Sequence, residues 1–201
     1  CTLGTFKKSL AIAQTIMPIC TAIEVPRVLS NWASMPIRPN CVAVGPGLST
    51  KNKAVSVLDN LLNFYKEIPL IIDADALNII AAKNWHKRIP KGSVISPHFR
   101  EFDRLFGTTE TADRHKVQEK NAQELGITIL LKGAYSRIVD PEGNIFYNST
   151  GNPGMAKGGS GDVLTGMICG LIARGYTPAE AACLATYLHG LAGDITAAKK
   201  S

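Results

Sequence analysis

The chain has 201 residues, of which 45% are hydrophobic and 19% are charged, and its formal net charge is +6. This composition excludes a disordered chain and predicts a single globular domain over residues 1–201. The basic residues are scattered without interleaved aromatics, so nucleic acid is not an expected partner. No apolar run reaches the roughly 18 residues of a membrane span, and no segment has the pattern of a signal peptide.

The cysteines indicate a reduced protein. There are five of them, an odd number, and no pair has the Cys-x-x-Cys spacing, which argues against a disulfide framework and a zinc site. The cytoplasm is therefore the expected compartment. The chain starts with Cys1 instead of Met and stops within a helical pattern at Ser201, so we expect it to be a piece of a longer chain.

The predicted elements alternate between helices and strands. In chain order they are a helix over residues 9–16, a strand over 41–44, a helix over 52–65, a strand over 70–72, a short helix over 76–82, a strand over 93–95, helices over 98–106 and 113–125, a strand over 128–131, an antiparallel pair over 136–139 and 145–147, and helices over 162–174 and 178–199. This order predicts a mostly parallel sheet covered by helices on both faces. Ligands then bind beyond the carboxyl ends of the strands.

A glycine-rich segment precedes the penultimate helix and contains Gly158, Gly159, Ser160, Gly161 and Asp162. Glycines let several backbone N–H groups converge, and together with the positive end of a helix these groups bind phosphate. Asp162 would lie in the first turn, where a carboxylate can take a proton from a hydroxyl during phosphoryl transfer. The alternative is a plain glycine-rich N-cap in which Asp162 complements the helix dipole.

A second candidate segment follows the strand over residues 128–131. It consists of Lys132, Gly133, Ala134, Tyr135 and Ser136. A lysine at a strand end followed by small residues allows a nucleotide to approach the backbone closely. A tight β-turn with a solvated lysine is the alternative.

Polar residues at other strand ends add weaker candidates. Asp73 and Asp75 could hold Mg²⁺ or water near a phosphate, or they could equally cap the helix over residues 76–82. Asn78 is a further candidate for the phosphate region. His98 follows Ser-Pro and could equally be a helix cap. His189 lies among apolar residues and is expected to be a packed helix residue.

Five segments resemble the NAD(P)H-hydrate dehydratases, and they occur in that family's order. They are VGPGL at 44–48, IDADALN at 72–78, SPH at 96–98 followed by Glu101, NPGMAKGGSGDVLTG at 152–166 and YLHGLAGD at 187–194. The resemblance implies a ribokinase-like three-layer α/β/α sandwich with a central, mostly parallel sheet. The family's N-terminal strand and helix are not recognisable here, so the chain is expected to lack them.

The resemblance also implies an activity. Such enzymes dehydrate (S)-NADHX and (S)-NADPHX to NADH and NADPH, which is metabolite repair by a carbon–oxygen lyase. The hydrate hydroxyl is phosphorylated by ADP, or by ATP in eukaryotic members, and phosphate is then eliminated with Mg²⁺ offsetting the phosphate charge. The expected partners are these hydrates and nucleotides, a fused or separate epimerase, and further copies of the chain in a homotetramer.

Functional residues carry over position by position. Asp162 matches a catalytic aspartate that also contacts the hydrate, and Gly47 and His98 match further substrate contacts. Residues from Lys132 to Ser136 match the nucleotide-binding stretch, together with Gly161 and its neighbours Gly158, Gly159 and Ser160. Ser136 and Ser160 replace the usual threonines and keep a hydroxyl, whereas Phe99-Arg100 replaces Pro-Gly and changes the segment after His98.

Two other functions compete with the dehydratase. One is a small-molecule kinase of the same fold that acts on a vitamin precursor or a sugar, because the glycine-rich aspartate suits both reactions. The other is a nucleotide-binding or scaffold protein without catalytic activity. A stable phosphorylated product would indicate the kinase, and nucleotide binding without turnover would indicate the second.

Overall fold

The computed structural model describes residues 2–5, 21–24, 39–107 and 110–200. Its six-stranded sheet has the order β3-β4-β5-β6-β7-β8. The strands are β3 (Val42–Val44), β4 (Leu70–Ile72), β5 (Val94–Ile95), β6 (Thr128–Leu131), β7 (Arg137–Val139) and β8 (Ile145–Tyr147). The pairs from β3 to β6 are parallel, and β7 and β8 add an antiparallel edge, so the mostly parallel sheet is confirmed.

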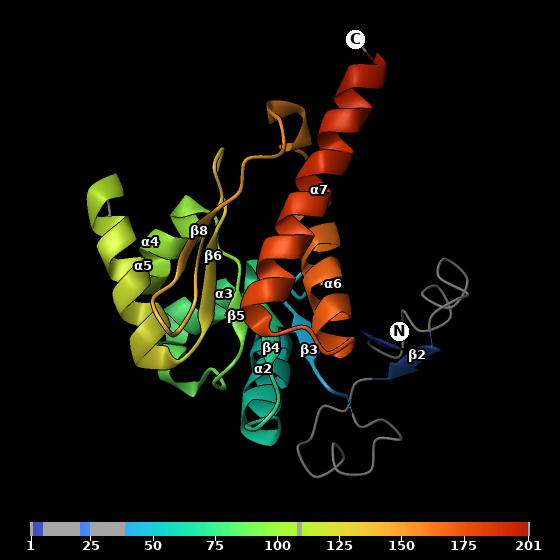
Figure 1. Cartoon of the computed structure of the whole chain (residues 1–201). Helices are drawn as coiled ribbons and strands as arrows, with labels where there is room; N and C mark the ends of the chain where they lie inside the picture. The colour runs from blue at the N-terminus through green and yellow to red at the C-terminus, as the bar shows by residue number, and fades with distance from the viewer. Residues whose placement is uncertain (1, 6–20, 25–38, 108–109, 201) are drawn as a thin grey trace.

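Helices cover both faces of this sheet (Figure 1). They are α2 (Asn52–Phe64), α3 (Ala74–Lys83), α4 (Phe99–Phe106), α5 (Thr111–Leu125), α6 (Ser160–Ala173) and α7 (Pro178–Lys200), with the short 3₁₀ helices η3 (His86–Arg88) and η4 (Pro153–Met155). Helices α2 to α5 pack on one face, and α6 and α7 pack on the other. The expected three-layer sandwich is therefore confirmed.

The two faces follow from the alternation of side chains along each strand. In β4, Leu70 and Ile72 join the core beneath α2 to α5, whereas Ile71 joins the core beneath α6 and α7. All three residues of β4 are fully buried. Strands that are buried on both faces require continuous apolar runs, and this requirement explains why the short segments LII and TILL form the centre of the sheet.

Helix α6 is attached to the first strand of the large sheet through two cysteines. The Cys41 thiol donates to the Cys169 carbonyl oxygen at 3.2 Å, and the two sulfur atoms lie 3.4 Å apart. Both thiols are free, as is the half-buried thiol of Cys183, whose pKa is raised to about 11 by burial. These three cysteines are packing residues of the core beneath α6 and α7.

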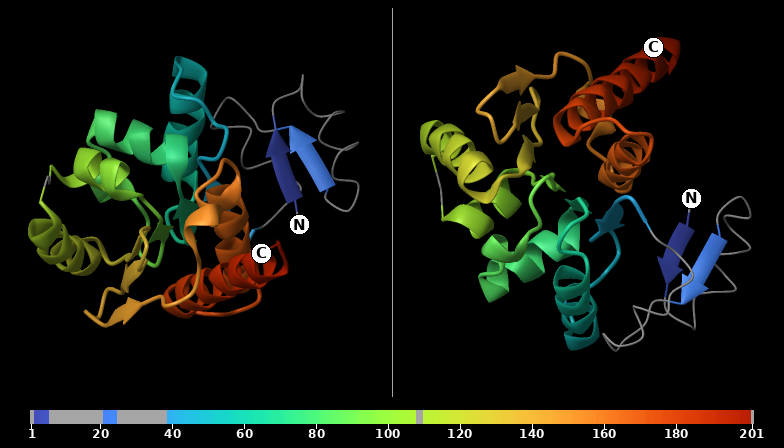
Figure 2. Two further views of the ribbon diagram at one scale, coloured as in Figure 1. Left: turned by 90° about the horizontal axis from the view of Figure 1, so that it is seen from above. Right: turned by 60° about the horizontal axis from the view of Figure 1, so that its bottom comes forward.

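The predicted elements agree with the structure to within two residues at each end, except near the N-terminus, and α5 and α6 begin two residues earlier than predicted. The sequence pattern predicts no strand before Cys41, yet β1 (Thr2–Thr5) and β2 (Thr21–Glu24) form a separate parallel pair (Figure 2). The helix predicted over residues 9–16 lies outside the described residues. Helix α3 begins at Ala74, two residues earlier than predicted. Within the described ranges, no helix has the length and apolarity of a membrane span.

Candidate active site

The candidate site lies at the carboxyl ends of the parallel strands. Backbone bonds of the sheet continue past the strands into the connecting segments. The Asp73 N–H donates to Val44 O at 3.1 Å, the Ser96 N–H to Ile72 O at 3.1 Å, and the Lys132 N–H to Pro97 O at 2.9 Å. The segments after β3, β4, β5 and β6 therefore lie side by side along one edge of the sheet, where the fold is expected to bind ligands.

The turn after β3 approaches the end of β4 so closely that only glycine fits. Gly45 has a φ of +132°, and a Cβ atom there would lie 1.7 Å from the Asp73 carbonyl oxygen. The two neighbouring segments also contain non-glycine residues with positive φ, namely Ser49 at 71° and Ala74 at 49°. Such backbone strain is concentrated at functional sites. The Gly-Pro-Gly turn is thus held directly beside Asp73.

Asp73 is the buried centre of this edge, with 2% of the residue exposed. Its Oδ1 accepts from the Ala74 N–H at 2.9 Å and from Lys132 Nζ at 2.7 Å, and its Oδ2 accepts from Thr165 Oγ1 at 2.9 Å. Asp73 is also the N-cap of α3. Of the two aspartates that could cap this helix, Asp73 does so and Asp75 does not, because the helix begins two residues earlier than predicted.

The glycine-rich segment meets this ion pair at the start of α6. Gly159 is the N-cap of α6 in the left-handed conformation, with a φ of +87°. A Cβ atom on Gly161 would lie 3.6 Å from both Asp73 Oδ2 and Lys132 Nζ. Three features of a phosphate site therefore lie together here: the positive end of a helix, a lysine ammonium and an exposed stretch of backbone.

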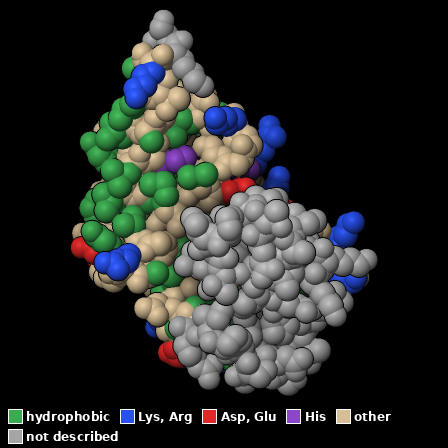
Figure 3. Space-filling view, turned by 90° about the vertical axis from the view of Figure 1, so that its right-hand side faces the viewer, with side chains coloured by type: hydrophobic (Ala, Val, Ile, Leu, Met, Phe, Trp, Pro, Cys, Tyr) green, Lys and Arg blue, Asp and Glu red, His purple; other side chains and the backbone are tan. Residues whose placement is uncertain are grey.

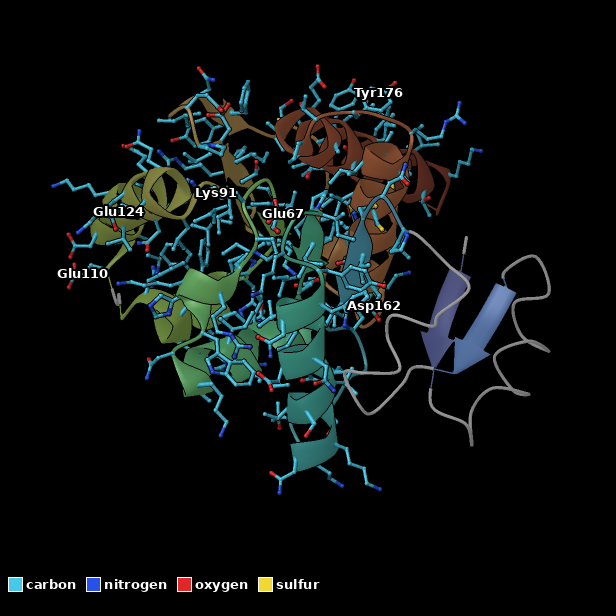
Figure 4. The ribbon with its side chains drawn as sticks, turned by 90° about the horizontal axis from the view of Figure 1, so that it is seen from below. Glu67, Lys91, Glu110, Glu124, Asp162 and Tyr176 are labelled. Atoms are coloured by element: carbon cyan, nitrogen blue, oxygen red, sulfur yellow. The ribbon has the colours of Figure 1, made fainter. Side chains whose placement is uncertain are left out.

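Asp162 lies in the first turn of α6, as predicted. Figure 4 shows it at the opposite end of this helix from Tyr176. The side chain is exposed, and across the described ranges no hydrogen bond or ion pair engages its carboxylate. A carboxylate in this state is available to accept a proton from a bound hydroxyl.

The segment after Lys132 is a tight, exposed turn. The Gly133 N–H donates to Ser136 Oγ at 3.3 Å, and the same hydroxyl donates back to Gly133 O at 3.3 Å. Tyr135 is 76% exposed, and the ring of Phe99 covers Gly133 so that a Cβ atom there would lie 2.9 Å from Phe99 Cζ. The hydroxyl that Ser136 retains thus closes the turn, and Ala134 and Tyr135 are presented to solvent.

The segment before the glycine-rich motif is anchored to α7. The Asp194 carboxylate accepts from the Gly151 N–H at 2.8 Å and from Asn152 Nδ2 at 2.9 Å, and these bonds lower the pKa of Asp194. Gly190 and Gly193 allow the contact, because a Cβ atom on either would lie 2.2 Å from Thr150 Oγ1 or Met155 Sδ, respectively. The segments at 152–166 and 187–194 therefore form one structural unit.

A cavity of about 530 Å³ lies between these two segments. It is lined by Gly158, Gly159 and Ser160 from the glycine-rich segment and by His189 and Gly193 from α7. Burial lowers the pKa of His189, which agrees with the expected packed histidine. The cavity reaches the start of α6, so it adds room for a ligand next to the candidate phosphate site.

His98 is both a helix cap and an open side chain. Its Nδ1 accepts from the N–H groups of Arg100 at 3.1 Å and Glu101 at 3.3 Å, while Glu101 Oε2 accepts from the His98 N–H at 2.9 Å. This capping box starts α4 directly at Phe99, so Phe99 and Arg100 lie in the first turn of the helix. Half of the imidazole remains exposed, and a substrate contact through Nε2 stays a prediction.

Two substitutions separate these roles of His98. His98→Ala removes the cap and is expected to cost about 1 kcal/mol of unfolding free energy, whereas His98→Asn keeps a capping oxygen and should cost less than half of that. Both remove Nε2, and the substrate contact that the family resemblance implies for His98 predicts a higher KM for the hydrate in both. Urea denaturation and steady-state kinetics provide the two readouts. An unchanged KM in the stable Asn variant would limit His98 to capping.

Of the three remaining predicted residues, Asp75 and Asn78 accept hydrogen bonds from other protein groups, whereas Gly47 lies in open space. Asp75 Oδ2 accepts from the Ser49 N–H at 2.8 Å and so fixes the segment after Gly47. Asn78 accepts from Arg104 in α4 at 2.6 Å, which ties it to that helix. Gly47 has a φ of +65° and open space around its Cα. Among the described residues, no group of three acidic, histidine or cysteine side chains could hold a metal.

Two residues at this site are missing from the sequence-based prediction. Gly45 belongs to the VGPGL segment, but its contact with Asp73 depends on how β3 and β4 are paired. Thr165 follows Gly161 by four residues, which places it on the same face of α6. That spacing is visible in the sequence, although the buried aspartate opposite it is not.

Comparison with known proteins decides the family. The carbohydrate-kinase family model described as NAD(P)H-hydrate dehydratase matches residues 8–201. The chain belongs to the NAD(P)H-hydrate dehydratase family. It is 36% identical to the ADP-dependent (S)-NAD(P)H-hydrate dehydratase of Neisseria meningitidis serogroup B, over 96% of this chain and 68% of that protein.

Other family members extend the likeness. A bifunctional NAD(P)H-hydrate repair enzyme of Moorella thermoacetica is 44% identical over 79% of this chain, which spans only 31% of that protein. The ADP/ATP-dependent NAD(P)H-hydrate dehydratase of Bacillus subtilis, co-crystallized with ATP/Mg²⁺, superposes with a TM-score of 0.79 at 29% identity, over 96% of this chain and 71% of that one. The ribokinase-like fold is confirmed by this likeness.

Proposed function

We propose that this family member converts (S)-NADHX and (S)-NADPHX back to NADH and NADPH at the expense of a nucleotide. One observation carries the proposal. Gly161 lies next to the ion pair between Asp73 and Lys132, and the free carboxylate of Asp162 follows directly in the same helical turn. A phosphate bound between the helix start and the lysine would have a general base within one turn. The Neisseria relative named as an (S)-NAD(P)H-hydrate dehydratase and the Moorella relative named as an NAD(P)H-hydrate repair enzyme support the substrate.

The reaction has two steps. The hydrate hydroxyl attacks the terminal phosphorus of the nucleotide, its proton passes to the Asp162 carboxylate, and the nucleotide leaves one phosphate shorter. The carbon–oxygen bond of the phosphorylated hydrate then breaks with phosphate as the leaving group, and loss of a proton from the adjacent carbon restores the double bond. Lys132 and the N–H groups at the start of α6 stabilise the phosphate charge.

ADP is the proposed phosphate donor, with ATP as the second candidate. The Neisseria relative is named ADP-dependent, and the Bacillus relative is named ADP/ATP-dependent. We place the phosphates between Gly158–Gly161 and Lys132, and the rest of the nucleotide against the turn from Gly133 to Ser136. Gly47 and His98 are proposed to contact the hydrate from the neighbouring strand ends.

Mg²⁺ fits this site as a companion of the nucleotide phosphates. Both carboxylate oxygens of Asp73 already accept hydrogen bonds from the protein, so Asp75 and Asp162 are the more open carboxylates. Asp162 is exposed, and within the described ranges Asp75 accepts a hydrogen bond through Oδ2 alone. Mg²⁺ is commonly held by one or two carboxylates together with substrate phosphates, and it would supply charge neutralisation during transfer.

Product analysis separates the dehydratase from the kinase alternative. We expect the purified protein with chemically prepared NADHX and ADP to release AMP, inorganic phosphate and NADH in equal amounts. ³¹P NMR identifies the phosphorus-containing products. A stable phosphate ester without inorganic phosphate or NADH would instead establish the kinase, and bound nucleotide without any product would favour a protein that only binds nucleotide.

Gly161→Ala tests the phosphate site without disturbing the fold. Its φ is not positive and a new Cβ would make only ordinary contacts of 3.6 Å, so helix stability should stay equal or rise by up to about 1 kcal/mol. The methyl group would enter the proposed phosphate position and weaken ADP binding, which calorimetry measures. Gly166→Ala, in the same helix with no atom within 4 Å of its Cβ, is the control. Equal ADP affinity in both variants would contradict the phosphate site.

We also propose an oligomeric state, a partner enzyme and a compartment for this protein. Exposed apolar side chains gather over α6 and α7 (Figure 3), including Val163, Tyr187, Leu188 and Ile195. Such a surface supports association into a homo-oligomer, and we propose the tetramer. Residues 1–201 form one dehydratase domain in this proposal. An epimerase, fused or separate, is proposed to act with it, and the relatives named as bifunctional repair enzymes support a second activity in a longer chain. The free thiols of the described cysteines favour the cytoplasm.

A further inference from the structure

We propose that Asp73 and Thr165 are positioning residues for Lys132, and that Thr165 couples the helix carrying Asp162 to the lysine that meets the phosphate. The expected effect on nucleotide binding rests on the proposed function. The bonds that carry it are independent of any ligand. They join β4, β6 and α6, three elements that are distant in the sequence.

Both oxygens of the Asp73 carboxylate accept hydrogen bonds from the protein. It accepts one backbone N–H and the Lys132 ammonium on Oδ1, and the Thr165 hydroxyl on Oδ2. Its side chain is only 3% exposed. A buried carboxylate requires such partners, because an unpaired charge in the interior is costly. Asp73 therefore serves to hold Lys132 in place.

Thr165 behaves differently from comparable helical threonines in this chain. Thr186 and Thr196 in α7 donate to the carbonyl oxygens four residues earlier, at 2.6 Å and 2.7 Å, which is the usual choice for a helical hydroxyl. Thr165, buried with 2% exposure, instead donates across the interface to Asp73 at 2.9 Å. This bond fixes the start of α6 against the end of β4.

The Lys132 ammonium keeps capacity for a ligand. It has three donors, and Asp73 Oδ1 is its acceptor at 2.7 Å. Its side chain is 22% exposed, and its Nζ would lie 3.6 Å from a Cβ atom on Gly161. The ammonium is thus held at the start of α6 with donors that can reach a phosphate. Fixing a flexible lysine before binding reduces the entropy lost when the phosphate binds.

The first experiment needs no nucleotide. Trace acetylation with acetic anhydride, followed by peptide mass spectrometry, measures the reactivity of Lys132 relative to the exposed Lys66. We expect Thr165→Val, which keeps the shape and removes the hydroxyl, to raise the relative labelling of Lys132 several-fold. Thr165→Ser should restore the wild-type rate. Thr186→Val, a buried helical threonine with an internal bond, should leave the rate unchanged.

The second experiment is a double-mutant cycle on ADP affinity measured by calorimetry. Thr165→Val should weaken ADP binding on the order of tenfold, as expected for one lost hydrogen bond to a charged group. If Thr165 acts through Lys132, the same change should add no loss in the Lys132→Met background. Thr165→Ser should bind ADP like the wild-type chain, and the melting temperature confirms that each variant is folded.

The outcomes are distinct. Unchanged Lys132 labelling in folded Thr165→Val, or additive losses of affinity in the cycle, would overturn the positioning role. Should Thr165→Val not fold, Thr165→Ala replaces it in both experiments, and failure of both to fold would make Thr165 a structural residue and overturn the inference. Absence of ADP binding by the wild-type chain would overturn the proposed function, whereas the labelling experiment would still decide the positioning.

Discussion

Asp162→Asn is expected to lower the rate of hydrate dehydration by roughly 10²–10⁴, the range contributed by a general base. Asparagine preserves the shape of the side chain and cannot accept the hydroxyl proton. The carboxylate is exposed and no hydrogen bond in the described residues engages it, so its removal should leave the fold intact. The loss of the favourable charge at the start of α6 costs only about 0.3–1 kcal/mol. Turnover measured at saturating nucleotide and hydrate gives the result.

The matched control is Asp113→Asn. Asp113 is also an exposed aspartate in the first turn of a helix, α5, which packs on the opposite face of the sheet. It experiences the same dipole effect without the neighbouring glycine-rich segment. We expect turnover by this variant to match the wild-type chain, and ADP binding to persist in both. Near-normal turnover by Asp162→Asn would exclude Asp162 as the general base.

Gly45→Ala is expected to destabilise the fold by about 3 kcal/mol or more. The backbone there has a φ of +132°, and the new methyl carbon would lie 1.7 Å from the Asp73 carbonyl oxygen. Neither atom can move freely, because Asp73 is joined to β3 through its N–H and to Lys132 through its carboxylate. The change should therefore reduce the unfolding free energy and ADP affinity together, as measured by urea denaturation and calorimetry.

Gly92→Ala controls for backbone strain alone. Gly92 has a φ of +73°, and a Cβ atom there would have no other atom within 4 Å, so only the left-handed conformation is penalised, by about 1–2 kcal/mol. If Gly45→Ala lowers the unfolding free energy by no more than Gly92→Ala does, the turn after β3 can move away from β4. The close contact would then have no part in shaping the site.

The sequence predicts most of the sheet because its strands are apolar and buried on both faces. The segments LII and TILL fit strands that are buried on both faces, and both form strands at the expected residues. Helix ends are predicted less well, since they depend on which polar side chain caps them. Asp73 and Asp75 are two residues apart, and the choice between them is decided by the pairing of Asp73 with β6 and α6.

For the site, too, local sequence patterns predict the segments but not the contacts between them. The segment from Gly158 to Asp162 can be recognised from the sequence, because clustered glycines before an apolar helix are typical of a phosphate-binding backbone. The ion pair between Asp73 and Lys132 joins residues that are 59 positions apart, and the bond from Thr165 to Asp73 spans 92. Such contacts follow from the order of strands in the sheet, which local sequence patterns do not specify.

The most direct test of the proposed activity is the appearance of reduced nicotinamide absorbance when NADHX, Mg²⁺ and ADP are mixed with the purified protein. We predict a rise that requires the nucleotide, that is faster with ADP than with ATP, and that is lost in Asp162→Asn. No rise with either nucleotide, in a folded protein that binds ADP, would contradict the dehydratase assignment and favour the kinase alternative.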